Sequence, residues 1–280
     1  MGNNIVVIVF SKNRAMQLSL CLETFFKNVD GGDFDVKCLY KVDEKHRKSY
    51  ELLDFQYSES VEFIEETNFR ENLLEAIDGY YKTMFVVDDC IFTSKFNLQQ
   101  ASDIMDYYPK ILGVSFRLGI NTKYCYSLSQ PQSIPAFIQR YVGKYQDFLG
   151  YEWPSANGDF QYALELSSSM YRTSNIKHIF DRVDFPNPNM CEWVLYCNLG
   201  IFVNALPILI CYENSVAFCN PVNRVQNVNN NKAGNDYYYD ADELLINFEN
   251  GYRIDNKKFE GFISNSCHQE VILDFVKRGD

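Results

Sequence analysis

Two adjacent carboxylates, Asp88 and Asp89, are the residues of this chain best suited to chemistry. They directly follow the apolar run of residues 84–87. Such a run is typical of a strand buried on both faces of a parallel sheet, where unpaired carboxylates are costly. The carboxyl ends of parallel strands are where open α/β sheets bind ligands. Because carboxylate oxygens suit divalent cations, the pair predicts a metal site that can also hold a diphosphate.

A short polar turn follows the first apolar run of the chain. Residues 5–10 have the pattern of a buried strand, and apolar residues spaced i, i+3, i+4, i+7 and i+8 predict a helix over 18–26. The turn between them carries Ser11 and Arg14. Because a helix N-terminus attracts anions and a cation adds to that attraction, the turn is a candidate anion site. A solvated basic turn is the alternative.

Strand and helix patterns alternate through the first half of the chain, which predicts a parallel sheet with right-handed crossovers. After about residue 119 the pattern weakens. The predicted elements are strands at 36–42, 61–64, 84–89, 111–118, 167–172 and 208–212, helices at 45–55, 69–81, 96–108, after 186–189 and at 242–251, an irregular substrate-facing segment at 120–160 and an Asn-rich loop at 223–236.

The overall composition disfavours some classes of partner. The formal net charge is -11 and the sequence pI is about 4.8, so the surface disfavours nucleic acid and anionic membranes. No apolar segment is long enough to span a bilayer or to form a signal-peptide core, so a soluble cytoplasmic protein is expected. The nine cysteines include no CxxC pair, which predicts reduced core thiols rather than disulfides or zinc ligands.

Four segments, which begin at residues 10, 87, 113 and 188, carry a joint resemblance to one family. Together they resemble the GT-A glycosyltransferases, especially the family-2-like group and the enzymes of large algal viruses, the chloroviruses. Asp88 and Asp89 stand in the place of the family's DXD metal motif, but they are adjacent rather than spaced by one residue. The segment of the family's catalytic base has one acid rather than a pair. The resemblance covers roughly the first 200 residues. The segments are 10–18, 87–89, 113–121 with 153–159 and 168–172 after it, and 188–193.

The resemblance implies an α/β, Rossmann-like GT-A fold: a mostly parallel central sheet flanked by helices in a single domain with a C-terminal extension. Residues 1–215 are expected to form the catalytic domain, with a nucleotide-sugar-binding half at 1–119 and an acceptor-facing half at 120–215. Residues 216–280 are expected to pack on it. The implied enzyme moves one sugar from a UDP-sugar, with UDP-xylose as one candidate, to a hydroxyl of an oligosaccharide or glycoprotein glycan. Inversion and assistance by Mn²⁺ or Mg²⁺ are expected.

On the nucleotide side, the resemblance implies that Asp89 binds the metal and Asp88 faces the ribose. Arg14 is expected to bind the diphosphate, and Ser11 to contact uracil through its backbone. Asp43, at the end of the second predicted strand, is expected to contact the base or the ribose. The alternatives are an acidic strand end paired with Lys or Arg and, at Asp43, an ordinary loop acid.

On the acceptor side, Glu192 is the expected general base, which takes the proton of the acceptor hydroxyl during in-line attack. A Glu that only stabilises a helix N-terminus is the alternative. Asp159 is the rival base or a ligand of sugar hydroxyls. His268 could complete the metal shell or contact the diphosphate, with a structural role as the alternative.

Other features leave further interpretations open. Tyr151 and Trp153 could stack on a sugar, although aromatic residues more often belong to a core. Residues 223–226 could bind a carbohydrate acceptor or form a polar surface loop. A nucleotidyltransferase of similar fold is a second possible function, although the first turn lacks the usual glycines. A non-catalytic glycan-binding module is a third, against which the intact acids count.

Overall fold

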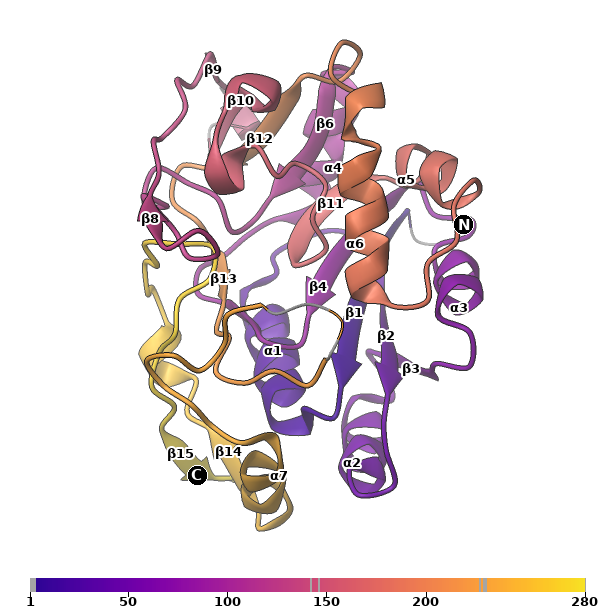
Figure 1. Ribbon diagram of the computed structural model, residues 1–280, viewed down its shortest axis with the longest axis vertical. Helices are drawn as coiled ribbons and strands as arrows, with labels where there is room; N and C mark the ends of the chain where they lie inside the picture. The colour runs from indigo at the N-terminus through magenta and orange to yellow at the C-terminus, as the bar shows by residue number, and fades with distance from the viewer. Residues whose placement is uncertain (1–3, 142, 146, 227, 229–230, 280) are drawn as a thin grey trace.

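Strands and helices alternate through the first part of the chain, as the sequence predicts (Figure 1). The computed structural model describes residues 4–141, 143–145, 147–226, 228 and 231–279. β1 lies between β2 and β4, β3 lies beyond β2, and all four strands run parallel. These first elements are β1 (Ile5–Lys12), α1 (Ala15–Asn28), β2 (Phe34–Lys41), α2 (Arg47–Tyr57), β3 (Glu62–Glu65), α3 (Phe69–Ala76) and β4 (Lys82–Val87).

The apolar run of β1 explains why the sheet is covered on both faces. Side chains along a strand point alternately to opposite faces. Val7 and Val9 belong to a core cluster that includes residues of α1, whereas Val6 and Ile8 belong to a second cluster with residues of α3. All four side chains are buried. The sheet is therefore the middle layer of three, and the ends of its strands are the places where polar groups reach solvent.

The second half of the sheet departs from the parallel arrangement. In the described chain the main sheet has nine strands, in the order β3-β2-β1-β4-β11-β6-β12-β10-β9. β11 (Ser168–Arg172) is antiparallel to both β4 and β6 (Ile111–Ser115), and β12 (Ile208–Tyr212) is parallel to β6. β10 (Phe148–Glu152) and β9 (Gln139–Arg140) come from the segment that was expected to be irregular. The sequence of a five-residue strand does not show whether it runs parallel or antiparallel to its neighbours, because the segment that connects the strands sets this direction.

Helices cover both faces of this sheet. α1, α2, α4 (Leu98–Tyr107) and α7 (Ala241–Glu249) contribute to the core on one face. α3, α5 (Thr173–Phe180) and α6 (Pro188–Cys197) contribute to the core on the other. In Figure 1, α6 crosses in front of the sheet. This position places one side of α6 against the core and leaves the other accessible to ligands.

Capping residues set two helix starts where the sequence predicts them. Asn187 caps α6, with Pro188 in the first helical position, and Asn68 caps α3. The predicted end of α3 at residue 81 is wrong. The helix ends at Ala76, and Gly79 follows with a φ of 81°, a conformation that cannot continue a right-handed helix.

The C-terminal residues pack against the end of the sheet that carries the acid pair. β5 (Cys90–Phe92) begins directly after Asp89 and pairs antiparallel with β13 (Ala217–Cys219). α7 contacts α1, and β14 (Tyr252–Ile254) pairs with β15 (Phe275–Lys277) at the lower left of Figure 1. The remaining short elements are β7 (Tyr124–Cys125), β8 (Gln130–Pro131), η1 (Gly143–Tyr145), η2 (Trp153–Ser155), η3 (Gly158–Phe160), η4 (Leu199–Ile201) and η5 (Lys257–Phe259).

The cysteines agree with the prediction of reduced core thiols. All nine cysteines carry free thiols, and eight of them are buried, Cys197 being the exposed one. None of the helices in the described part of the chain is long and apolar enough to cross a membrane.

Candidate functional site

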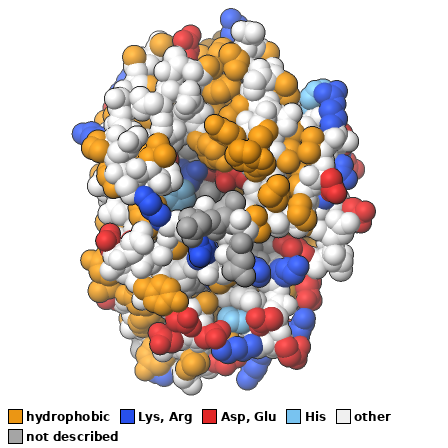
Figure 2. Space-filling view, in the orientation of Figure 1, with side chains coloured by type: hydrophobic (Ala, Val, Ile, Leu, Met, Phe, Trp, Pro, Cys, Tyr) orange, Lys and Arg blue, Asp and Glu red, His pale blue; other side chains and the backbone are white. Residues whose placement is uncertain are grey.

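A cleft of about 1330 Å³ opens where β1 and β4 end. Its lining also includes residues of α6 and of the segment after β13. Figure 2 shows the hollow on this face, with hydrophobic side chains gathered beside it over α6. Small-molecule sites typically enclose roughly 300–1,000 Å³, so this cleft has room for two ligands side by side. The predicted site residues that line it are Ser11, Arg14, Asp88, Asp89, Asp159, Glu192 and His268.

Asp88 faces the turn after β1. Its side chain is 1% exposed. Its Oδ2 accepts hydrogen bonds from the Ser11 hydroxyl at 2.9 Å and the Lys12 N–H at 3.2 Å, and its Oδ1 lies 2.7 Å from Arg14 Nη2. Burial raises the pKa of Asp88 to about 6, although Arg14 opposes the shift. Protein groups therefore engage both oxygens, and the predicted contact with a ribose stays a prediction.

Arg14 joins Asp88 to Asp89. Its Nη1 lies 3.2 Å from Oδ2 of Asp89, whose side chain is 14% exposed. Burial disfavours the charged guanidinium, but the two carboxylates outweigh burial and raise the pKa of Arg14. The guanidinium contacts both carboxylates and balances one of their two charges, and its predicted contact with a diphosphate stays a prediction. This pairing of the acids with Arg14 agrees with the alternative to a metal and ribose site, an acidic strand end paired with an arginine. Arg14 nevertheless lines the cleft, where a ligand can reach it.

A tyrosine that sequence reasoning missed holds this turn in place. The hydroxyl of Tyr50, from α2, lies 2.5 Å from the Ser11 hydroxyl and accepts a hydrogen bond from the Arg14 N–H at 3.1 Å. Its side chain is 1% exposed. In the sequence Tyr50 is one apolar position of a predicted helix, so no local pattern indicates that it belongs to the site. It fixes the main chain from which Arg14 projects.

Asp43 stands apart from the cleft lining. Its carboxylate accepts hydrogen bonds from the Asn13 amide at 2.8 Å and the His46 N–H at 3.1 Å. These contacts tie the turn after β2 to the turn after β1. The expected contact of Asp43 with a base or ribose stays a prediction.

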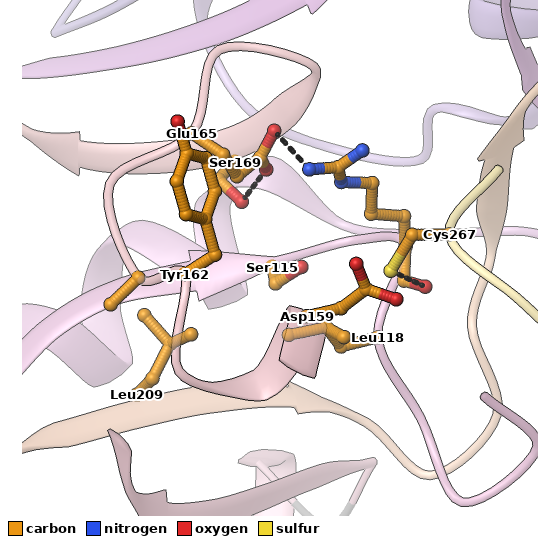
Figure 3. A pocket seen from close by; sticks show the side chains of 10 residues that line it. Ser115, Leu118, Asp159, Tyr162, Glu165, Ser169, Leu209 and Cys267 are labelled. Atoms are coloured by element: carbon orange, nitrogen blue, oxygen red, sulfur yellow. Dashed lines mark hydrogen bonds and ion pairs between the residues drawn. The ribbon is translucent and has the colours of Figure 1, made fainter. Parts of the chain in front are cut away.

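Arg117 forms a second charged centre, which the sequence analysis did not assign. Its side chain is buried, and its Nη2 lies 3.0 Å from Glu165. Glu165 also accepts hydrogen bonds from the Ser167 N–H and the Ser169 hydroxyl. Figure 3 shows Glu165 and Ser169 on one side of a narrow gap and Asp159 on the other. Arg117 lies two residues after the end of β6, but the predicted strand at 111–118 extends past it, so the strand-end argument that found Asp88 did not single it out.

His268 lies beside this centre. Its Nε2 is 3.3 Å from Arg117 Nη1. Burial first, and then the charge of Arg117, lower the pKa of His268 to about 3. The imidazole is therefore neutral near pH 7, and its accepting nitrogen, Nε2, faces the Arg117 guanidinium, which can only donate.

Glu192 and Asp159 are the two acids on this side of the cleft. Glu192 accepts a hydrogen bond from the Leu166 N–H at 3.1 Å, and burial, with Glu165 second, raises its pKa. Asp159 accepts one from the Gln132 amide at 3.1 Å, and burial raises its pKa against the opposing effect of Arg117. A carboxyl with a raised pKa is a stronger base when ionised, which suits proton transfer from a hydroxyl.

The donor set for a divalent cation is incomplete. In the part of the chain that the structure describes, no three His, Cys, Asp or Glu side chains gather closely enough to hold a metal. Asp89 offers a partly exposed carboxylate, and His268 lines the same cleft. Because Mg²⁺ is commonly held by one or two carboxylates together with substrate phosphates, these residues fit an ion that arrives with a diphosphate.

The predicted aromatic platform is wrong for Tyr151. Its side chain is fully buried, and its hydroxyl donates to the Phe160 carbonyl at 3.1 Å. Trp153 lines the cleft but is only 3% exposed, and its indole N–H donates to the Leu206 carbonyl at 2.8 Å. Among the aromatic side chains in the described lining of the cleft, the exposed ones are instead Trp193 and Tyr196 on α6. Alternation along a strand could not reveal this, because both faces of the sheet are covered.

One carboxylate fastens the segment after β13, which contributes residues to the lining of the cleft. Glu270 accepts hydrogen bonds from three consecutive backbone N–H groups, at 2.9 Å from Asn235, 2.7 Å from Asp236 and 2.8 Å from Tyr237, and one from the Tyr126 hydroxyl. Burial alone would raise the pKa of Glu270, but these donors outweigh it and lower the pKa. The segment after β13 is thereby tied to the C-terminal residues.

Comparison with known proteins places this geometry in context. No protein-family model matches the chain. The chain is 31% identical over 196 residues to the bifunctional glycosyltransferase pgtA of Dictyostelium discoideum, which is 65% of this chain and 25% of that protein. It therefore spans about a quarter of the length of this relative. The crystal structure of S. aureus TarS matches with a TM-score of 0.51 at 15% identity, over 78% of this chain and 36% of that chain. TarS 1–349 in complex with UDP matches with a TM-score of 0.48 at 14% identity, over 78% and 59%.

These matches confirm the predicted fold class. The described residues form an α/β domain with a large, mostly parallel sheet flanked by helices, which resembles GT-A glycosyltransferase structures. The similarity in sequence is to a protein named as a glycosyltransferase.

Proposed function

We propose that this chain is an inverting glycosyltransferase, which moves one sugar from a nucleoside diphosphate sugar to a hydroxyl of a carbohydrate. The observation that carries the proposal is the cleft, which has an acid pair with its arginine at the strand ends and the half-buried carboxyl of Glu192 on α6. The similarity to a named glycosyltransferase supports the same class.

The donor's diphosphate would lie near the end of β1. Arg14 lines the cleft there, together with Lys12 and Lys41. A doubly charged leaving group is stabilised by cations that are already positioned. Arg14 would then exchange part of its contact with Asp89 for the diphosphate, since one guanidinium has five N–H donors.

A divalent cation, Mn²⁺ or Mg²⁺, would be held by Asp89 and by oxygens of the donor, and His268 would join them as a neutral ligand by turning its Nε2 from Arg117 to the ion. The ion would supply charge neutralisation for the departing diphosphate. Asp88 would act indirectly, because its contacts with Ser11 and Lys12 keep the turn and Arg14 in place.

Glu192 would act as the general base. Its carboxylate takes the proton from the acceptor hydroxyl while that oxygen attacks the anomeric carbon of the donor. The bond between this carbon and the diphosphate oxygen breaks with its electron pair, so the nucleoside diphosphate leaves. Asp159 is the alternative base, because it lines the same cleft and its pKa is also raised.

The first experiment is calorimetric titration with UDP, GDP and CDP, each with and without Mn²⁺. UDP binding that depends on Mn²⁺ is the expected result. Slow hydrolysis of one UDP-sugar, from a panel that includes UDP-xylose, UDP-glucose and UDP-galactose, should follow. No binding of any of these nucleotides would remove the proposal and favour a glycan-binding role.

A further inference from the structure

Three aromatic side chains form a continuous stack along the cleft. Trp193 and Tyr196 stack with ring centroids 5.7 Å apart, and Tyr196 and Tyr162 stack at 5.2 Å. We call these three residues the aromatic ladder, and all of them line the cleft. Trp193 is 54% exposed and Tyr196 is 45% exposed. Large apolar surface left open beside a polar cleft commonly marks a binding site.

The aromatic ladder leads to the proposed base. Tyr196 lies one helical turn after Glu192 on α6, so their side chains share one side of the helix. Tyr162 faces the carboxyl of Glu192, and its interaction with that carboxyl opposes the rise in the pKa of Glu192. A ring seated on Tyr162 or Tyr196 would therefore have its hydroxyls next to Glu192.

The chemistry of the ladder fits one class of ligand. A pyranose has an apolar face of C–H groups and a rim of hydroxyls, so it can stack on an aromatic ring while its edge forms hydrogen bonds. The cleft supplies polar side chains close by in sequence, at Gln161, Asn187 and Asn189. A serine or threonine side chain of a protein acceptor has no such face to stack.

We propose that the aromatic ladder is the acceptor subsite and that it binds the terminal pyranose of an oligosaccharide. This inference rests on the proposed function, because it makes Glu192 the group that meets the acceptor hydroxyl. It goes further by placing the terminal pyranose of that carbohydrate on named side chains, Trp193, Tyr196 and Tyr162.

Tryptophan fluorescence tests the subsite without any donor. The chain has two tryptophans, and the other, Trp153, is buried. Titration with lactose, cellobiose and methyl mannosides should give a saturable blue shift and protection of Trp193 from acrylamide quenching. Glycerol and a Ser/Thr-rich peptide should give neither. The change should vanish in Tyr196→Ala and persist in Tyr196→Phe, which keeps the ring.

Transfer kinetics provide the second readout once a donor is known. Tyr196→Ala should raise the KM for the sugar acceptor roughly five- to tenfold, as expected for loss of one aromatic contact, and lower kcat/KM for that acceptor by a similar factor. The matched control is Phe55→Ala, which removes an 82% exposed ring on α2 away from the cleft and should change neither.

Three outcomes would overturn the subsite. They are the absence of a fluorescence change with every sugar in a protein that binds UDP, sugar protection that survives Tyr196→Ala, and burial of Trp193 by self-association, seen as concentration-dependent sedimentation. Failure of the proposed function gives a different pattern, because nucleotide binding would then be absent while the sugar titration could still succeed.

Discussion

The substitution Arg14→Gln should destabilise the protein by an amount that depends on pH. It removes the guanidinium that lies 2.7 Å from the buried carboxylate of Asp88. Breaking a buried ion pair by removing one partner costs about 3–5 kcal/mol. The loss of stability caused by Arg14→Gln is smaller at pH values at which Asp88 is protonated, because a neutral carboxyl needs no cation beside it.

The pKa of Asp88 sets the pH window. Burial raises this pKa to about 6 in the folded protein, above roughly 3.9 in an unfolded chain. The folded state therefore binds the proton more tightly, and the intact protein loses about 3 kcal/mol of stability as the pH rises from below 4 to above 6. Without Arg14 the folded pKa is higher still, so the variant continues to lose stability at pH values above 6.

Urea unfolding at pH 5 and pH 8 measures this difference. We expect Arg14→Gln to lose about 3 kcal/mol at pH 8 and less than about 1 kcal/mol at pH 5, where Asp88 is largely protonated in both proteins. The control is Arg47→Gln, which removes the exposed pair with Glu65 and should show a small loss without this trend. An equal loss at both pH values would refute the reasoning.

Three further predictions concern turnover. Asp89→Asn should keep the fold, as judged by its urea midpoint, and lose metal-dependent turnover; full activity would remove Asp89 from the metal site. Glu192→Gln should keep nucleotide binding by calorimetry and lower transfer by about 10²–10⁴-fold, the range for a lost general base. If transfer survives, the same substitution at Asp159 is the next to test. Because burial raises the pKa of Glu192, the rate should fall on the acidic side at a pH above the ordinary range of Glu, and a limb at the ordinary position would contradict this assignment.

The strand ends could be predicted because they depend on local patterns. The apolar runs of β1 and β4 place Arg14 and Asp88 at neighbouring ends of a parallel pair, which is why both line the cleft. The start of α6 follows in the same way from Asn187 and its prolines, and it brings Glu192 to the cleft.

The partners of these residues could not be predicted, because contacts between distant segments have no local signature. Tyr50 is 36 positions from Arg14, and Arg117 is 48 positions from Glu165, yet each contact determines the charge or position of a site residue. Burial of Tyr151 has the same origin. Its environment depends on β12 and β9, which pair with β10 from either side.

Residues 235–237 tolerate redesign because Glu270 holds them through main-chain groups. Glu270 holds residues 235–237 through their backbone N–H groups, so the fastening does not depend on which side chains these exposed positions carry. Gly234 must stay, since its φ is 67° and a Cβ there would lie 2.6 Å from the ring of Tyr238. Residues 235–237 can therefore be exchanged for any residue except proline, which has no N–H to donate, while the main chain beside the cleft keeps its course.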